Sequence, residues 1–271
     1  MGTIGHAPDY DGQLGDKCLE QPGKLISSAL LQSRTSTIHS ATKSEAEQNG
    51  FYRFLGNESV SEGVLIKEMT QRCARNAVGR EVLVIQDSSS LGLSNNARNI
   101  KADSGLGLVG NKKGLGFLSH VSLVLDAHTE SMLGFCDIQL WHRTLDKSNN
   151  TTGACKHQPI EAKESYKWIK ASNQAKEVLS AASDITIIQD RERDIYEQFC
   201  LIPDHRTSLI IRSRDNRRLS DGSRLYDALK GSPVLGLYTL ELPKDLRKSK
   251  PQGIIEMEVR CEPVSKSLLK A

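Results

Sequence analysis

The chain is poor in aromatic residues and has no long apolar run. Phe, Trp and Tyr make up 5% of its 271 residues. No stretch reaches the roughly 18 consecutive apolar residues that a membrane-spanning helix needs. The first residues, from Met1 to His6, lack the basic-then-apolar order of a secretory signal peptide. We therefore expect a cytoplasmic protein with no membrane partner.

Cysteine is present, but not in a pattern that binds metal. The chain has six cysteines, and no two of them form the Cys-x-x-Cys spacing of a zinc or redox site. Cys155 stands two residues before His157, but two such side chains on a polar loop are more often a coincidence than half of a metal site. We expect reduced, unpaired thiols.

Charge is nearly balanced overall and unevenly distributed. Thirty-six basic residues against 33 acidic ones give a formal net charge of +3, which says little about partners. From Arg206 to Arg224, however, six arginines stand against two aspartates, and a second basic cluster covers 244–250. Such stripes can bind a phosphate backbone because each cation releases condensed counterions. On charge alone, an ordinary solvated surface remains the favoured interpretation.

The local patterns change character near residue 80. Before it, the chain has good helix formers, with Ser61 as a plausible N-cap and Pro22 expected to break or begin a helix. After it, the order is strand, hairpin, helix, strand, helix, strand, helix. This order predicts an α/β fold with a mixed sheet covered by helices, and it is also the order of a ribonuclease-H-like core. The expected strands are 82–85, 120–125, 132–138, 184–190 and 208–212. Three helices are expected, one that begins at Pro159 and two that cover 195–201 and 224–230.

Two further alternating runs, 237–242 and 254–259, are typical of exposed strands. No later segment is visible to pair them, so we expect a β-rich insertion that is cut short. The predicted domains are a helical domain over 1–80, a catalytic core over 81–235 and the start of a truncated insertion over 236–271.

Two aspartates end apolar strands in matching contexts. Asp87 follows Val84-Ile85-Gln86, and Asp190 follows Ile187-Ile188-Gln189. Strand ends are rigid and suit groups that need fixed geometry. Two neighbouring carboxylates repel unless a cation lies between them, and Mg²⁺ is a hard, oxygen-seeking cation. Two such ions can activate a water and stabilise the leaving oxygen of a phosphodiester. The alternative for either Asp is a turn or capping residue.

Several blocks of the sequence resemble one protein family. Residues 190–196, Asp-Arg-Glu-Arg-Asp-Ile-Tyr, resemble the signature Asp-Arg-Glu-Ala-Asp-Ile, and residues 86–91 resemble a block containing Asp-Thr-Thr-x-Leu. Residues 13–17 and 51–57 resemble Gln-Leu-Gly-Asp-Lys/Arg and Ala-Tyr-Arg-Phe-x-x-Asn. With 163–168 and 211–214, the blocks keep the family order over about residues 10 to 260. The chain is thus similar to bacterial insertion-sequence transposases with an Asp-Asp-Glu active site, in the insertion-sequence-four family.

The resemblance implies a ribonuclease-H-like core, a helical domain that binds double-stranded DNA at transposon ends, and a homodimer on paired ends. It also implies Mg²⁺ or Mn²⁺ as cofactor. The implied residues are Asp87 and Asp190 for metal binding and catalysis, Tyr52, Arg53 and Asn57 for end recognition, and Arg212 and Arg214 near the cleaved strand. For the last two, a cation that simply leaves a sheet edge is an equal alternative.

The sequence also departs from the family pattern. Cys18 and Pro22 stand where the family usually has Arg, which affects the expected strength of end binding. The third carboxylate, within Tyr-x-x-Arg-x-x-x-Glu-x-x-x-x-x-x-Lys, is absent, so we expect that this polypeptide alone does not cut DNA. Three interpretations remain open: part of a transposase enzyme, a DNA-binding module or inhibitor of transposition without catalysis, and a decayed coding sequence.

A glycine-rich stretch, residues 105–110, fits the dinucleotide fingerprint Gly-x-Gly-x-x-Gly. Its context does not fit, because that fingerprint requires a strand immediately before it and a helix that begins within it. We expect a flexible glycine-rich loop.

Overall fold

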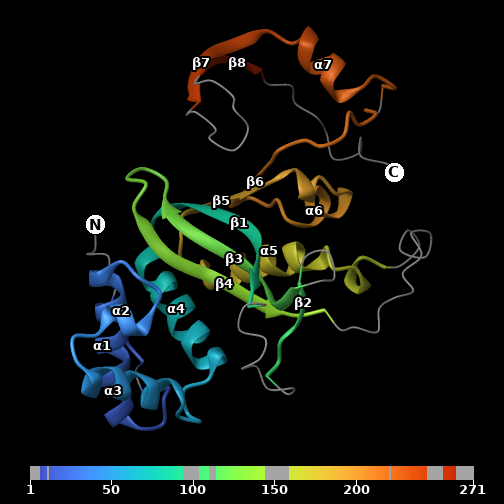
Figure 1. The fold of residues 1–271 in the computed structure, drawn as a ribbon. Coiled ribbons are helices and arrows are strands. Elements are labelled where there is room, and N and C mark those ends of the chain that lie inside the picture. The colour runs from blue at the N-terminus through green and yellow to red at the C-terminus, as the bar shows by residue number, and fades with distance from the viewer. Residues whose placement is uncertain are drawn as a thin grey trace.

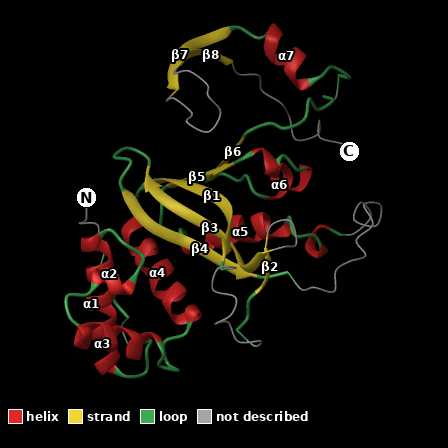
Figure 2. Cartoon of the chain, in the orientation of Figure 1, coloured by secondary structure: helices red, strands yellow, loops and turns green. Residues whose placement is uncertain are grey.

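The computed structural model describes residues 7–10, 12–93, 104–109, 114–143, 159–219, 221–242 and 253–260. Within these ranges, a group of N-terminal helices adjoins a mixed sheet, and a separate β-ribbon follows at the C-terminal side (Figures 1 and 2). No described helix combines the length and apolar character needed to cross a bilayer. The four cysteines in the described part, Cys18, Cys73, Cys136 and Cys200, are free thiols, as predicted for them.

The N-terminal group consists of α1 (Lys17–Ser33), α2 (Ile38–Ala41), α3 (Glu45–Leu55) and α4 (Glu62–Ala77). Three of them begin at a side chain that caps a backbone N–H group, as helix starts require. Asp16 accepts from the Cys18 amide, Ser44 from the Glu47 amide and Ser61 from the Val64 amide at 3.3 Å. The prediction of Ser61 as an N-cap is therefore confirmed.

Pro22 neither breaks nor begins a helix, contrary to the prediction. Helix α1 starts earlier, at the Asp16 cap, and continues through Pro22 to Ser33. Proline removes one helical N–H donor, but the next turn is held by packing. The Tyr10 ring lies so close to Gly23 that an added Cβ would be 2.5 Å from Tyr10 Cε2, and Ile26 is buried beside it.

The main sheet contains β1 (Glu81–Gly92), β2 (Gly107–Val109), β3 (Gly114–Asp126), β4 (Met132–Trp141), β5 (Asp184–Gln189) and β6 (Thr207–Ile211). Its order is β4-β3-β1-β5-β6, with β2 also paired to β3. Strand β3 is antiparallel to β1 and β4, whereas β5 is parallel to β1 and β6 is parallel to β5. The predicted hairpin is thus present as β3–β4. This mixed order is compatible with a ribonuclease-H-like sheet.

Helical segments follow the sheet strands as η3 (Ile160–Ala162), α5 (Tyr166–Val178), η4 (Arg191–Arg193), α6 (Tyr196–Leu201) and α7 (Leu225–Gly231). The helix predicted to open at Pro159 instead begins at Tyr166. Pro159 starts only a single 3-10 turn, because Lys163 takes an extended backbone conformation and ends it. The helices predicted over 195–201 and 224–230 match α6 and α7 to within one residue.

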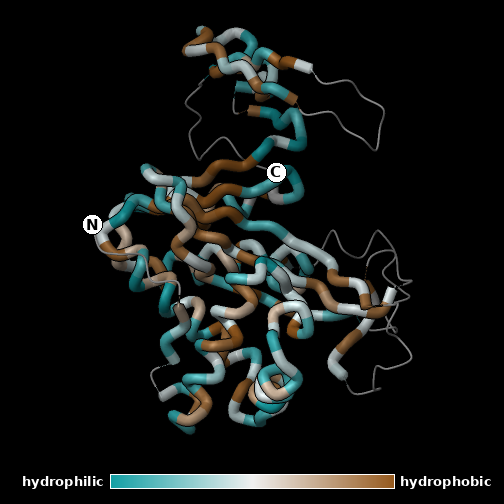
Figure 3. The backbone as a smooth tube through the Cα atoms, turned by 60° about the vertical axis from the view of Figure 1, so that its left-hand side comes forward, coloured by the Kyte–Doolittle hydropathy of each residue, from teal (hydrophilic) through white to brown (hydrophobic). Residues whose placement is uncertain are grey.

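Two apolar cores hold the N-terminal helices and the main sheet with the helices packed on it. The larger lies between the sheet and helices α4 and α5, and includes Cys73, Val84, Ile169 and Ile187. The smaller is formed within the N-terminal helices, around Tyr10 and the two buried phenylalanines of α3. Figure 3 shows the apolar strands at the centre of the molecule. Helix α4 faces both cores, because its C-terminal half packs on the sheet while Val64 and Leu65 pack on the smaller core.

The last two strands correct one prediction. Strands β7 (Val234–Leu242) and β8 (Gly253–Arg260) pair antiparallel with each other, from Leu242–Gly253 to Val234–Arg260. The sequence pattern predicts that no later segment pairs with these strands and that they lack a partner, but each strand is the partner of the other. The domain boundaries themselves stay a prediction.

The glycine-rich stretch also differs from its prediction. Residues 107–109 form the short strand β2 against residues 114–116 of β3 instead of belonging to a loop throughout. Gly110 lies outside the described residues, as do Cys155, His157 and the basic cluster over 244–250.

Candidate functional site

The register between β1 and β5 places Asp87 and Asp190 next to each other. The two strands are parallel, and Gln86 pairs with Gln189 as their last partners. Asp87 is the next residue of β1, Asp190 directly follows the last residue of β5 with an extended backbone, and both are exposed. Because side chains alternate along a strand, residues at equivalent positions of parallel neighbours project from the same face. Both carboxylates therefore leave the same edge of the sheet.

Asp87 is not the end of its strand, contrary to the prediction. Strand β1 continues to Gly92, and this extension pairs with β3 from Asp87–Val121 to Gly92–Gly116. What ends at Asp87 is the pairing with β5, since β5 stops at Gln189. Asp87 thus lies where β1 loses one neighbour and keeps the other.

A buried amide network lies beneath the two aspartates. Gln189 Nε2 donates to Gln86 Oε1 at 2.6 Å and to Ser172 Oγ on α5 at 3.2 Å. Gln198 Nε2 on α6 donates to the same hydroxyl at 2.9 Å, and Ser172 Oγ donates to the Trp168 carbonyl. Within the described residues, Gln86 Nε2, Gln189 Oε1 and Gln198 Oε1 are buried and make no hydrogen bond, so the network is only partly satisfied. The bonds that it does make tie Gln86 and Gln189 to α5 and α6.

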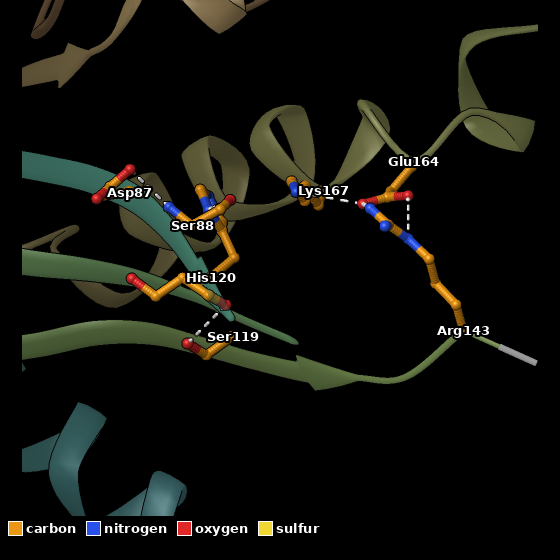
Figure 4. Close-up of polar contacts among 8 residues, drawn as sticks. Asp87, Ser88, Ser119, His120, Arg143, Glu164 and Lys167 are labelled. Atoms are coloured by element: carbon orange, nitrogen blue, oxygen red, sulfur yellow. Dashed lines mark hydrogen bonds and ion pairs between the residues drawn. The ribbon is translucent and has the colours of Figure 1, made fainter. Parts of the chain in front are cut away.

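Asp87 is followed by a serine that contacts a buried histidine. Asp87 Oδ1 accepts from the Ser88 amide at 2.8 Å, and Ser88 Oγ lies 3.0 Å from His120 Nδ1. His120 is fully buried, with its ring centroid 4.3 Å from that of Trp168. Figure 4 shows Ser88 and His120 beside Asp87. His120 is not among the predicted site residues, because it stands in a strand whose pattern is that of an ordinary, mostly apolar strand.

Asp190 forms an ion pair with a predicted DNA-binding residue. Arg212 Nε lies 2.9 Å from Asp190 Oδ1, and both side chains are about half exposed or more, at 61% and 48%. Arg212 directly follows β6, the parallel neighbour of β5. Asp190 and Arg212 thus directly follow β5 and β6, Asp87 lies on β1 where its pairing with β5 ends, and Arg214 stands two residues further along the chain.

Asp194 anchors the segment that carries these arginines. It is buried, and its Oδ2 accepts from the amides of Arg214 and Asp215 at 2.8 and 3.0 Å, while Arg217 Nε binds Oδ1 at 2.8 Å. Burial acts to raise the pKa of Asp194, but the two amides and the guanidinium outweigh it and lower that pKa below its ordinary value. Asp194 therefore stays ionised.

The arginine-rich stretch is only partly a solvated stripe. Arg206 Nη1 donates to the carbonyls of Ser180 and Ala182, and Arg224 Nη1 donates to the carbonyl of Asn216. Together with Arg217, these side chains stabilise loops of their own chain. The charge count alone could not separate such structural arginines from those that face solvent.

The three residues predicted for end recognition lie elsewhere. Tyr52 and Arg53 are exposed on α3, because Phe51 and Phe54 on either side of them are buried in the smaller core. Asn57 is exposed just after the helix and accepts from the Ser59 amide. In Figure 1, α3 lies among the N-terminal helices, away from β1 and β5. The fold does not bring these residues to the aspartates.

The carboxylate oxygens of Asp87 and Asp190 are suitable ligands for a divalent cation. Two carboxylates that directly follow the last β1–β5 pair supply the hard oxygen donors that Mg²⁺ prefers, and Mg²⁺ is commonly held by one or two carboxylates together with substrate phosphates. Within the described ranges, no group of three or more His, Cys, Asp or Glu side chains is arranged to hold a metal ion. The pair is therefore a partial ligand set.

Comparison with known proteins gives a structural similarity and no family. No protein-family model matches the chain. Its structure is similar to the cryo-EM structure of the piggyBac transposase synaptic complex with hairpin DNA, with a TM-score of 0.36 and 14% sequence identity. The similarity covers 88% of this chain and 50% of that one, so this chain spans about half the length of its match. A likeness of this degree establishes no activity, which has to be argued from the site.

Proposed function

We propose that this chain belongs to the cut-and-paste DNA transposases of the insertion-sequence type, with Asp87 and Asp190 as metal-binding carboxylates. The observation that carries the proposal is the parallel register of β1 and β5, in which Gln86 and Gln189 are the last pair and Asp87 and Asp190 come directly after them. The sequence blocks around both residues support the same assignment.

The residues of the chain have distinct tasks in this proposal. Asp87 and Asp190 would hold Mg²⁺ or Mn²⁺, which supplies the charge that activates a water and stabilises the leaving oxygen of a phosphodiester. The amide network of Gln86 and Gln189 keeps the two carboxylates in register. Arg212 balances the charge of Asp190 and, with Arg214, offers cations to a DNA strand at this edge.

DNA recognition is proposed for a second surface. Tyr52, Arg53 and Asn57 are exposed on and after α3, and they would contact double-stranded DNA at a transposon end. A homodimer would then hold two such ends together. Cations and amides on an exposed helix are the groups that usually position a protein on a duplex.

One contact favours a second candidate function, a DNA-binding module without catalysis. The ion pair between Arg212 and Asp190 already neutralises one carboxylate. An Arg–carboxylate pair is stable without a metal, so the same edge could bind DNA through its arginines alone.

Metal binding by the purified full chain separates the two candidates. We expect Mn²⁺ to bind, detected by electron paramagnetic resonance, and Asp87→Asn or Asp190→Asn to weaken binding by more than about tenfold, since even outer-shell substitutions cost about that much. Asp184→Asn is the matched control, because Asp184 is an exposed aspartate at the opposite end of β5. Equal Mn²⁺ binding by all three variants and the parent chain would reject the metal site.

A further inference from the structure

Two polar cavities lie on either side of the aspartate pair. One, of about 310 Å³, lies over β1 and the start of α5, and we call it the serine cavity; it is lined by Ser88, Ser89, Ser90, Arg143, Glu164 and Lys167 among others. The other, of about 400 Å³, lies beyond β5 and β6 and is lined by Arg212 and Arg214. Glu192, two residues after Asp190, lines both cavities.

The strand order explains why the cavities flank the site. The serine cavity contains the residues that follow Asp87 on β1, and the arginine-lined cavity contains those that follow β6. Asp87 and Asp190 stand between them, because β5 lies between β1 and β6. A chain molecule that passes over the two aspartates along this edge would therefore enter both cavities.

The serine cavity offers cations that are fixed in place. Arg143 donates to Glu164 through Nε at 3.1 Å and Nη2 at 2.8 Å, and Lys167 Nζ lies 3.7 Å from the same carboxylate (Figure 4). The Lys167 ammonium also lies 4.6 Å from the ring centroid of Trp141. Two cations thus share one carboxylate, and the two bonds use only part of the five N–H donors of the guanidinium. These three side chains carry a net charge of +1, and Glu192, which also lines the cavity, brings its charged lining to two cations and two carboxylates.

Hydroxyl groups complete the lining. Ser88 Oγ is oriented by the buried His120 and belongs to the residue next to Asp87. Ser89 and Ser90 continue along β1 and are exposed. Hydroxyl and guanidinium groups together are typical ligands of phosphate oxygens in DNA backbones.

We infer that the serine cavity binds a backbone phosphate of a single DNA strand that passes over Asp87 and Asp190. The inference rests on the proposed function of that pair. The arginine-lined cavity takes the same strand on the other side of the two aspartates. Across both cavities, five cations face two glutamates, namely Arg143, Lys167, Arg191, Arg212 and Arg214 against Glu164 and Glu192.

Binding of a short fluorescein-labelled single-stranded oligonucleotide, followed by anisotropy at several salt concentrations, tests the inference. We expect Arg143→Ala to weaken binding by about tenfold and to reduce the salt slope by about one. Lys170→Ala is the matched control, since it removes one exposed cation from the same helix as Lys167 without touching the cavity. Equal affinity of the Arg143 and Lys170 variants overturns the inference.

Glu164→Gln should change oligonucleotide affinity in the direction opposite to Arg143→Ala. Replacing this carboxylate with a neutral amide removes the group that competes with phosphate for Arg143 and Lys167, so we expect tighter oligonucleotide binding. Damage to the fold would lower the affinity, so a gain in affinity cannot come from misfolding. Glu164→Gln therefore tests phosphate binding in the serine cavity even if Arg143→Ala does not fold. Unchanged or weaker binding by Glu164→Gln in that case overturns the inference.

Two further measurements show whether the bound phosphate belongs to a DNA strand and which of the two proposals is wrong if a prediction is not met. Inorganic phosphate that binds as tightly as the oligonucleotide indicates a small-anion site and overturns the strand assignment. The Mn²⁺ measurement on the same variants separates the two proposals. If Mn²⁺ binds at the aspartates while Arg143→Ala has no effect, only the cavity assignment fails; if Mn²⁺ does not bind, the proposed function fails.

Discussion

Asp194 shows how one buried carboxylate can organise a functional loop. Three groups from positions 214–217 converge on it, two of them backbone amides and the third the Arg217 guanidinium. These bonds set the course of the chain directly after β6, where Arg212 and Arg214 stand. A residue that is not itself in the candidate site therefore determines where the cations of that site lie.

The lowered pKa of Asp194 gives this residue a pH signature. Because its pKa is lower in the folded than in the unfolded chain, its contribution to stability is fully present above the ordinary carboxyl pKa of about 4 and is lost as pH falls below that value. We expect Asp194→Asn to lower the free energy of unfolding at neutral pH by about 1.5–3 kcal/mol.

Urea unfolding at a series of pH values measures both effects. The difference between parent and variant should shrink as pH falls below about 4. Asp184→Asn, at an exposed strand start, serves as the control. A difference that stays constant down to the lowest pH would contradict the assignment of the ionised carboxylate.

At the scale of elements, the contact between α4 and β4 depends on one glycine. Gly134 has a φ of +137°, and a Cβ added there would lie 3.0 Å from Cys73 Cβ on α4. Cys73 is fully buried, and burial raises the pKa of its thiol to about 12, so it packs as a neutral apolar group. The close approach of helix and strand requires a residue without a side chain.

Gly134→Ala should therefore push α4 away from the sheet. We expect a loss of about 1–3 kcal/mol in the free energy of unfolding, the usual cost of overpacking, with additional backbone strain from the positive φ. Thermal unfolding followed by circular dichroism measures it. Gly236→Ala in β7 is the matched control, since nothing lies within 4 Å of its added Cβ. Equal melting temperatures for both variants would show that the approach is not tight.

At the scale of the whole molecule, the two proposed activities lie on different cores. The aspartates stand on the sheet, whereas Arg53 stands on α3, which packs in the smaller core of the N-terminal helices. Among the described elements, only α4 contributes residues to both cores. DNA end binding and metal binding should therefore be separable by substitution.

Arg53→Ala tests this separation. We expect it to weaken binding to double-stranded end DNA by about tenfold, the size of one lost charged contact, while Mn²⁺ binding at the aspartates stays unchanged. Arg75→Ala on α4 removes another exposed cation from the helical group and should have little effect. If both variants bind end DNA equally, α3 is not the recognition surface.

The sequence by itself determined the kinds of elements and much of their order. Strands β5 and β6, the β3–β4 hairpin and the Ser61 cap follow from local patterns of apolar, β-branched and capping residues. These patterns report local propensity and burial, which depend on residues only a few positions apart. The matching contexts of Asp87 and Asp190 are local in the same sense.

The tertiary structure alone decided which segments meet. It extended β1 past Asp87 because β3 offers a partner there, paired β7 with β8, and joined Arg212 to Asp190. It also placed His120 under Ser88 and brought Arg143 and Glu164 together. Each of these contacts joins residues far apart in the chain, so its energy depends on strand order and register, which no local pattern records.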